Sequence, residues 1–212
     1  MMPKNTYKPY LQDRNWLWLS TSGFLLLIAS LIVNFYSTKY ASLSMSSPVS
    51  DIVLSNIRVY DVEIAFVWGG IVFWFFTLLL AISKPTRLPF VSKSVALFVL
   101  IRSVFISLTH IASFPTHLVI EPTKFLGMFS YYGDLFFSGH VGLPFLMALI
   151  FWHNKKLRVL LLAAALFFSV VVLMGHIHYS IDVLGAFFIT YTIYQIAIWL
   201  FKKDKELFDS GR

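Results

Sequence analysis

The sequence contains no cysteine, and charged residues make up only 13% of its 212 residues. The absence of cysteine excludes disulfides, thiol nucleophiles and thiolate metal sites. Hydrophobic residues make up 58% of the chain, and both shares lie far from those of soluble domains. This composition indicates a protein committed almost entirely to the membrane, with no room for a separate soluble domain.

Six apolar runs reach or approach the length of about 20 residues that a helix needs to cross a bilayer. These runs cover residues 16–35, 62–82, 95–113, 136–152, 157–174 and 181–201. The first run is too long for the core of a signal peptide, so we expect it to remain as the first span. The predicted fold is all-α: a polytopic membrane protein in which residues 1–212 form one membrane-embedded domain, a six-transmembrane-helix bundle.

The net charge is +7, and the basic residues are distributed unevenly. If the six spans alternate in direction, 13 lysines and arginines fall on the side of both termini, and the opposite loops hold only Lys39, Arg58 and Lys124. Basic loops favour the cytoplasm, so both termini are predicted to be cytoplasmic. The positive charge therefore reports topology and gives no evidence for binding to nucleic acid.

Two short polar segments about 40 residues apart carry the candidate chemistry. Residues 133–140 read Gly-Asp-Leu-Phe-Phe-Ser-Gly-His, and residues 175–182 read Gly-His-Ile-His-Tyr-Ser-Ile-Asp. Polar and ionisable groups at the ends of apolar spans are costly to keep, which indicates a function. Alternation of the spans places both segments on the outer side, where they open the fourth and sixth spans.

His178 and Asp182 are four residues apart and share one face if the sixth helix has begun. A carboxylate that accepts a hydrogen bond from one imidazole nitrogen leaves the other nitrogen unprotonated and aimed, as attack on phosphorus requires. The alternative is a polar pair that caps a helix at the membrane interface. The second segment favours the catalytic interpretation over this alternative.

The second segment supplies an anion site and a further histidine. Ser138 and Gly139 stand at a predicted helix start, where free backbone N–H groups and the helix dipole hold phosphate oxygens. His140 is a candidate to protonate the leaving alkoxide and later to deprotonate the acceptor. The alternative interpretation of His140 is an ordinary interfacial histidine.

Arg102 falls near the middle of the third predicted span, where an arginine costs several kcal/mol unless it is paired or faces a cavity. A guanidinium that faces a cavity at this depth is suited to hold a phosphodiester. A salt bridge, or snorkelling of the side chain to the inner edge of the membrane, is the alternative.

Asp134, with Tyr131 and Tyr132, is a candidate cage for an ammonium head group such as choline or ethanolamine. An interfacial aromatic belt is the equally weighted alternative. The outer histidines lack the spacing expected of helix-borne metal sites, so no metal is predicted.

These segments resemble the type-2 phosphatidic acid phosphatase superfamily, and most closely its sphingomyelin synthase-like branch. Residues 133–140 resemble the first signature of that branch and residues 176–183 the second, while Arg102 gives a fainter third match. The similarity covers about residues 98–200. Val171-Val172 stand where the phosphatases of the superfamily carry Ser-Arg, and the sequence has no Lys-x6-Arg-Pro segment. The sphingomyelin synthase branch lacks both features too, so these departures favour that branch.

The resemblance implies an enzyme with a triad on the extracytoplasmic face, in which His178 is the nucleophile, Asp182 orients it and His140 is the acid/base. It implies transfer of phosphocholine or phosphoethanolamine from a phospholipid to ceramide or another lipid alcohol such as diacylglycerol, without a cofactor. The residues expected to bind the substrate are Arg102, Ser138, Gly139, Asp134, Tyr131, Tyr132 and Tyr179. Two alternatives remain: a hydrolase of lipid phosphates such as phosphatidic acid or a polyprenyl diphosphate, and a non-catalytic transporter or scaffold.

Overall fold

The computed structural model describes residues 6–118 and 135–211. Within these residues every regular element is a helix, and no strand occurs. The elements in chain order are η1 (Tyr10–Gln12), α1 (Arg14–Leu43), η2 (Leu54–Asn56), α2 (Glu63–Ile82), α3 (Leu88–Leu108), α4 (Gly139–Ile150), α5 (Lys155–Met174), α6 (Ser180–Leu200) and α7 (Lys202–Ser210).

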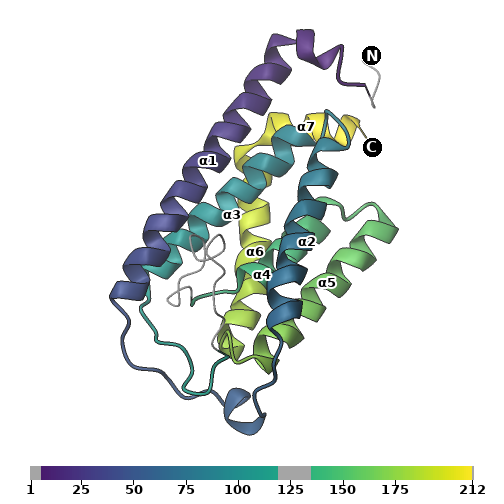
Figure 1. Ribbon diagram of the computed structural model, residues 1–212. Helices are drawn as coiled ribbons and strands as arrows, with labels where there is room; N and C mark the ends of the chain where they lie inside the picture. The colour runs from purple at the N-terminus through teal and green to yellow at the C-terminus, as the bar shows by residue number, and fades with distance from the viewer. Residues whose placement is uncertain (1–5, 119–134, 212) are drawn as a thin grey trace.

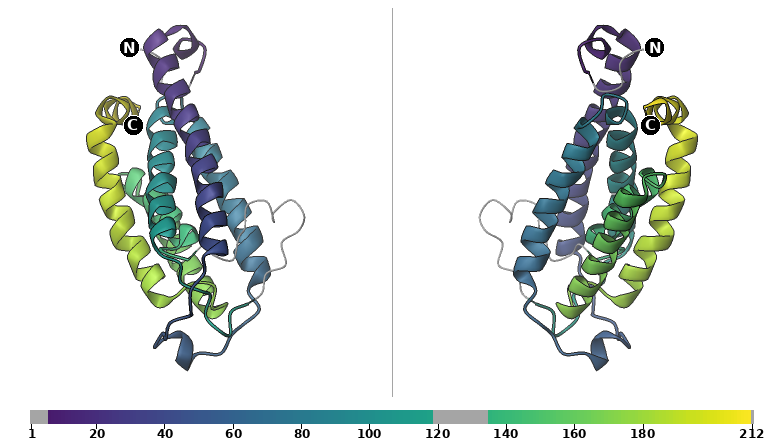
Figure 2. Two further views of the ribbon diagram at one scale, coloured as in Figure 1. Left: turned by 90° about the vertical axis from the view of Figure 1, so that its left-hand side faces the viewer. Right: turned by 90° about the vertical axis from the view of Figure 1, so that its right-hand side faces the viewer.

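The helices α1 to α6 alternate in direction and form one bundle (Figure 1). The start of α1 and the short helix α7 lie at the same end of this bundle, which we call the terminal end (Figures 1 and 2). The connections that follow α1 and α5 lie at the opposite end, which we call the loop end. The starts of α4 and α6, which carry the two polar segments, are therefore both directed toward the loop end.

Five of the helices are long and apolar enough to cross a membrane, and they are α1, α2, α3, α5 and α6. The prediction of an all-helical membrane bundle is confirmed at this level. The run at residues 136–152 forms a helix of only 12 residues, α4, whose length of about 18 Å falls short of a hydrocarbon core of about 30 Å. A sixth full-length span is therefore not confirmed.

Helix α4 occupies the interior of the bundle. Nine of its residues are buried, from Val141 to Ile150, and they form the centre of the hydrophobic core with side chains from α3, α5 and α6. An apolar run of this length suits a core helix covered by protein as well as a span covered by lipid, so the sequence pattern cannot separate the two.

The boundaries of two predicted spans differ from those of the helices. Helix α1 starts directly after Asp13, whose carboxylate accepts a hydrogen bond from the backbone N–H of Asn15 at 2.9 Å, and it continues well beyond residue 35. Helix α3 begins seven residues before the predicted start at residue 95, because Pro89 occupies the first turn, where proline is favoured. It ends at Leu108 because Thr109 adopts an extended backbone.

The terminal end is closed by α7. The ammonium of Lys93 in α3 lies 2.7 Å from the carboxylate of Asp204 in α7, and both side chains are buried. The ring of Phe208 in α7 packs against Phe90 and Phe151 of the core. These contacts hold α7 across the end of the bundle that is opposite to the polar segments (Figure 1).

Candidate active site at the loop end

His178 and Asp182 form a buried pair at the start of α6. The Nδ1 atom of His178 lies 3.2 Å from Oδ2 of Asp182, and the two residues are 5% and 2% exposed. His178 precedes the first helical residue, Ser180, so the pair does not lie on two helical turns as the sequence spacing suggested. The contact forms because Asp182, the third residue of the helix, reaches back over the helix start.

Asp182 also caps its own helix. Its Oδ2 atom accepts a hydrogen bond from the backbone N–H of Tyr179 at 3.1 Å, which satisfies one of the unpaired donors of the first turn. The cap and the hydrogen bond to His178 are thus both present in the structure. A carboxylate held in this way can accept the Nδ1–H of His178 and leave Nε2 with a free lone pair, which is the reactive tautomer for a nucleophile.

Asp51 is a site residue that the sequence analysis missed. Its Oδ2 atom accepts the backbone N–H of Ser180 at 2.7 Å, and its Oδ1 atom accepts those of Val53 at 2.8 Å and Leu54 at 3.1 Å. Burial alone would raise the pKa of Asp51, but the hydrogen bonds from Leu54, Ser180 and Val53 outweigh it and hold that pKa below its usual value. A second carboxylate, from the loop between α1 and α2, therefore anchors the start of α6.

Tyr179 joins two further loops to this helix start. Its hydroxyl donates a hydrogen bond to the carbonyl of Ala112 at 2.8 Å and accepts one from the N–H of Val49 at 3.3 Å. The ring is buried and forms an edge-to-face pair with the ring of Phe114. These contacts give Tyr179 a structural role between the α1–α2 and α3–α4 connections, and its part in substrate binding stays a prediction.

His176 lies two residues after the last residue of α5 and has a left-handed backbone conformation, with φ of 51°. The backbone N–H of Ile177 bonds the carbonyl of Val172 at 2.9 Å, and that of His176 bonds Leu173 at 3.0 Å, the pattern of a Schellman cap. The Nδ1 atom of His176 lies 2.7 Å from the hydroxyl of Thr116. His176 is therefore a buried structural histidine that turns the chain from α5 toward the His178–Asp182 pair.

The burial of His176 changes its titration. Burial lowers the pKa of its imidazole, and this effect is opposed in part by the backbone of Ile57 and by the charge of Asp51. We therefore expect this histidine to be neutral at physiological pH.

The two polar segments meet at the start of α4. The backbone N–H of Ser138 donates to the carbonyl of Asp182 at 3.3 Å, which ties the first turn of α6 to the residue preceding α4. The Oγ atom of Ser138 is fully buried, and it has no hydrogen-bond partner within residues 6–118 and 135–211. The structure thus joins the backbone of Ser138 to that of Asp182, the residue whose carboxylate bonds His178.

Arg102 of α3 reaches the same point. It is 7% exposed, and its Nε atom donates to the carbonyl of Phe137 at 3.2 Å. A Cβ atom added to Gly139 would lie 3.3 Å from Nε and 3.5 Å from Cζ of Arg102. The guanidinium therefore lies directly against the N-terminus of α4 and does not extend to the membrane edge. The positive end of the helix and a buried cation converge here, and both stabilise an anion.

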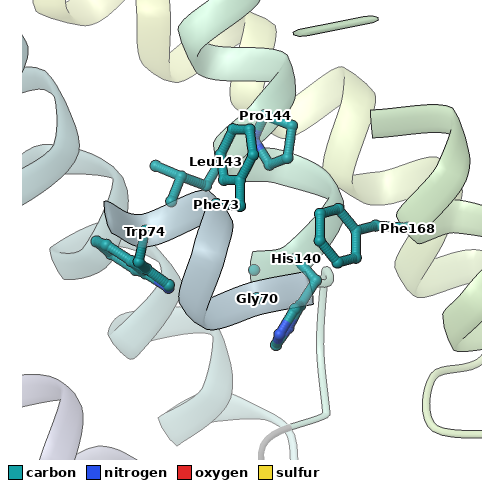
Figure 3. Close-up of a pocket in the computed structure, with 8 residues that line it drawn as sticks. Gly70, Phe73, Trp74, His140, Leu143, Pro144 and Phe168 are labelled. Atoms are coloured by element: carbon teal, nitrogen blue, oxygen red, sulfur yellow. The ribbon is translucent and has the colours of Figure 1, made fainter. Parts of the chain in front are cut away.

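His140, in the first turn of α4, lies between α2 and α5. Its ring stacks on Phe66 with centroids 4.0 Å apart and lies 5.5 Å from the ring of Phe168. It forms one wall of a small pocket between α2, α4 and α5, which is otherwise lined mainly by apolar side chains such as Phe73 and Trp74 (Figure 3). Pro144 in α4 has no N–H to donate to the carbonyl of His140, which loosens this first turn.

Three predicted residues, Asp134, Tyr131 and Tyr132, lie outside the described residues, so the ammonium cage stays a prediction. Within the described part of the chain, no group of three or more histidine, aspartate or glutamate side chains is placed to hold a metal ion. The described contacts join His178, Asp182, Ser138, Gly139 and Arg102, with Asp51 as their support. His140 belongs to the same first turn of α4, but its ring packs against Phe66 of α2 and Phe168 of α5, so its part in the site stays a prediction.

Residues 132–199 match the family model of the PAP2 superfamily C-terminal region. This match supports the type-2 phosphatidic acid phosphatase superfamily. It spans both polar segments and all of α4, α5 and most of α6. Comparisons with curated proteins and with solved structures give no significant match. The superfamily match supports an activity of the lipid phosphatase or phosphotransferase type, acting on lipid substrates in the membrane.

Proposed function

We propose that this protein is a lipid phosphotransferase, which moves phosphocholine or phosphoethanolamine from a phospholipid to ceramide or another lipid alcohol such as diacylglycerol. The observation that carries the proposal is the buried hydrogen bond between His178 and Asp182. An imidazole oriented by a carboxylate is the arrangement that nucleophilic catalysis at phosphorus requires. In this proposal residues 1–212 act as a single catalytic domain of the sphingomyelin synthase-like kind.

The reaction proceeds in two displacements. In the first, Nε2 of His178 forms a bond to phosphorus while the bond from phosphorus to the oxygen of the departing diacylglycerol breaks, and His140 gives that oxygen a proton. In the second, His140 takes the proton of the acceptor hydroxyl, whose oxygen attacks phosphorus and breaks the P–N bond. This second step restores His178. The phosphohistidine intermediate replaces one displacement with a high barrier by two displacements with lower barriers.

The anion site accounts for the preference for a diester. The N-terminus of α4, the buried hydroxyl of Ser138 and the guanidinium of Arg102 supply donors for phosphate oxygens. A diester carries one negative charge and a monoester close to two, so a monoester benefits from several cations. Arg102 is the one cation identified among these donors, which suits a single charge.

The acceptor decides between transfer and hydrolysis, and the superfamily match is compatible with both. The test compares phosphatidylcholine, phosphatidylethanolamine and phosphatidic acid at equal surface concentration, with fluorescent ceramide or diacylglycerol as acceptor. We expect a fluorescent lipid that carries the phospho-head group, identified by mass spectrometry, and little phosphate from phosphatidic acid. Faster phosphate release from phosphatidic acid, without any fluorescent product, would assign the protein to the phosphatases instead.

The proposed topology has six passes, with α4 as a short pass inside the bundle, cytoplasmic termini and an extracytoplasmic loop end. The support is the basic bias of the loops at the terminal end. Because the chain has no cysteine, single cysteines can report the two sides. On intact cells, a membrane-impermeant maleimide is expected to label Ser55→Cys at the loop end and to leave His153→Cys, between α4 and α5, unlabelled until the cells are permeabilised. Both positions are exposed, so the opposite labelling pattern would invert the topology.

A further inference from the structure

Helix α2 contains two consecutive glycines, Gly69 and Gly70, in its interior. Glycine lowers the intrinsic stability of a helix, so an interior glycine calls for a reason such as a close approach of another group. Each of the two glycines meets a different neighbour. Gly69 lies against the ring of Phe168 in α5, whereas Gly70 lies against the imidazole of His140 in α4.

The approach of His140 to Gly70 leaves no room for a side chain. A Cβ atom at Gly70 would lie 2.6 Å from Nε2 of His140, closer than a Cβ atom approaches an unbonded atom, and 3.1 Å from Cδ2, which is a tight contact. Figure 3 shows the His140 ring beside this glycine. Phe66 lies one helical turn before Gly70 on the same face of α2, and its ring stacks on the imidazole at 4.0 Å. Phe66 and Gly70 together form a seat for His140.

Gly69 provides a matched control because the group that its side chain would meet is the ring of Phe168, which neighbours His140, and not the imidazole itself. A Cβ atom there would lie 3.3 Å from the nearest atom of Phe168, a contact that a small shift of that ring relieves. The same glycine-to-alanine change at adjacent positions of one helix thus differs in whether it displaces His140.

We propose that Gly70 is a positioning residue for His140: by lacking a side chain, it lets the imidazole lie against α2 and fixes the orientation of the group that transfers the proton. The proposal rests on the proposed function, in which His140 serves as acid and base. An added methyl group must push the ring away by close to 1 Å, and a misplacement of about 1 Å can cost about 100-fold in rate. The substrate binding contributed by Arg102 and the α4 N-terminus is left in place.

The kinetic test measures kcat and KM of Gly70→Ala, Gly69→Ala, His140→Ala and the double variant Gly70→Ala/His140→Ala. We expect Gly70→Ala to lower kcat about 10- to 100-fold with little change in KM, and Gly69→Ala to stay within about threefold of the wild type. In the His140→Ala background, Gly70→Ala should have no further effect on the residual rate, because the group that it displaces is absent. Wild-type activity of Gly70→Ala, or an equal loss in both backgrounds, would overturn the proposal.

A measurement that does not depend on turnover separates this proposal from the proposed function. In protein labelled at histidine, the His140 ring resonance, assigned by its loss in His140→Ala, should shift further in Gly70→Ala than in Gly69→Ala, where only the neighbouring ring of Phe168 has to move. Unshifted resonances in Gly70→Ala would refute the seat even if the enzyme is active. A clear shift in a protein without His178-dependent turnover would refute only the proposed function. If Gly70→Ala does not fold, Phe66→Leu removes the stacking partner from the same seat and is held to the same expectations.

Discussion

Replacement of His178 by alanine is expected to lower turnover of a phospholipid donor by about 10⁴-fold or more, because the atom that would form the covalent bond to phosphorus is lost. The imidazole is buried and hydrogen-bonded to Asp182, so the alanine variant also leaves that carboxylate without its partner. The loss should therefore be measured on protein whose thermal unfolding in detergent shows that it is folded. His153→Ala, at an exposed histidine between α4 and α5, is the matched control and should keep full activity.

The covalent intermediate gives this prediction a second measurement. With a donor labelled at phosphorus, the wild type should form an acid-labile phosphoenzyme that peptide mass spectrometry assigns to His178, and His178→Ala should form none. Asp182→Asn should still form it, with turnover lowered about 10³- to 10⁴-fold, because the amide favours the wrong imidazole tautomer without removing the nucleophile. Full activity of His178→Ala would eliminate the phosphohistidine mechanism.

Replacement of Arg102 by lysine is expected to lower kcat/KM for a diester donor about 100- to 1000-fold, the cost of losing one preorganised donor to a developing charge. Lysine keeps the charge, but it cannot reproduce the planar donor set that bonds the carbonyl of Phe137 through Nε and still presents nitrogens to a phosphate. Arg102→Met, which keeps much of the length and removes the charge, should lose at least as much.

The control for Arg102 concerns folding, because both variants leave the buried carbonyl of Phe137 without this donor. An unpaired buried acceptor costs about 1–3 kcal/mol, which a membrane bundle of this size can lose and remain folded. Thermal unfolding should therefore show a lowered midpoint with a cooperative transition in each variant. Wild-type kinetics in a folded Arg102→Met protein would show that the guanidinium supports the fold and does not hold the phosphate.

The pairing of His178 with Asp182 could be predicted because the two residues are close in the chain, and Arg102 because a charge within an apolar run is costly. Asp182 meets His178 across four residues, and the length of the apolar runs indicates the helices that carry the motifs. Asp51 was missed because its partner Ser180 is 129 residues away, and an aspartate in a polar loop has no local signal of such a contact. The contact between a loop and the start of a distant helix depends on the tertiary structure, which local sequence patterns do not reveal.

Two further features of the structure could not be read from local patterns. Gly175 is the residue that sequence rules would place in the left-handed position after α5, yet that conformation falls on His176, one residue later. Gly175 serves a different need, since a Cβ atom there would lie 2.6 Å from the side chain of Val62. The short length of α4 could not be predicted either, because an apolar run has the same composition whether protein or lipid covers the helix.

The buried pair of Lys93 and Asp204 has a practical consequence for anyone who handles the protein. A chain cut before α7, whether by design or by a protease, would leave the ammonium of Lys93 without its counter-charge, and breaking such a pair costs about 3–5 kcal/mol where the remaining charge stays buried. An affinity tag or fluorescent reporter should therefore not disturb Asp204. Such a fusion belongs on a flexible linker after α7, where it leaves the pair with Lys93 intact and stays at the end of the bundle away from the candidate site.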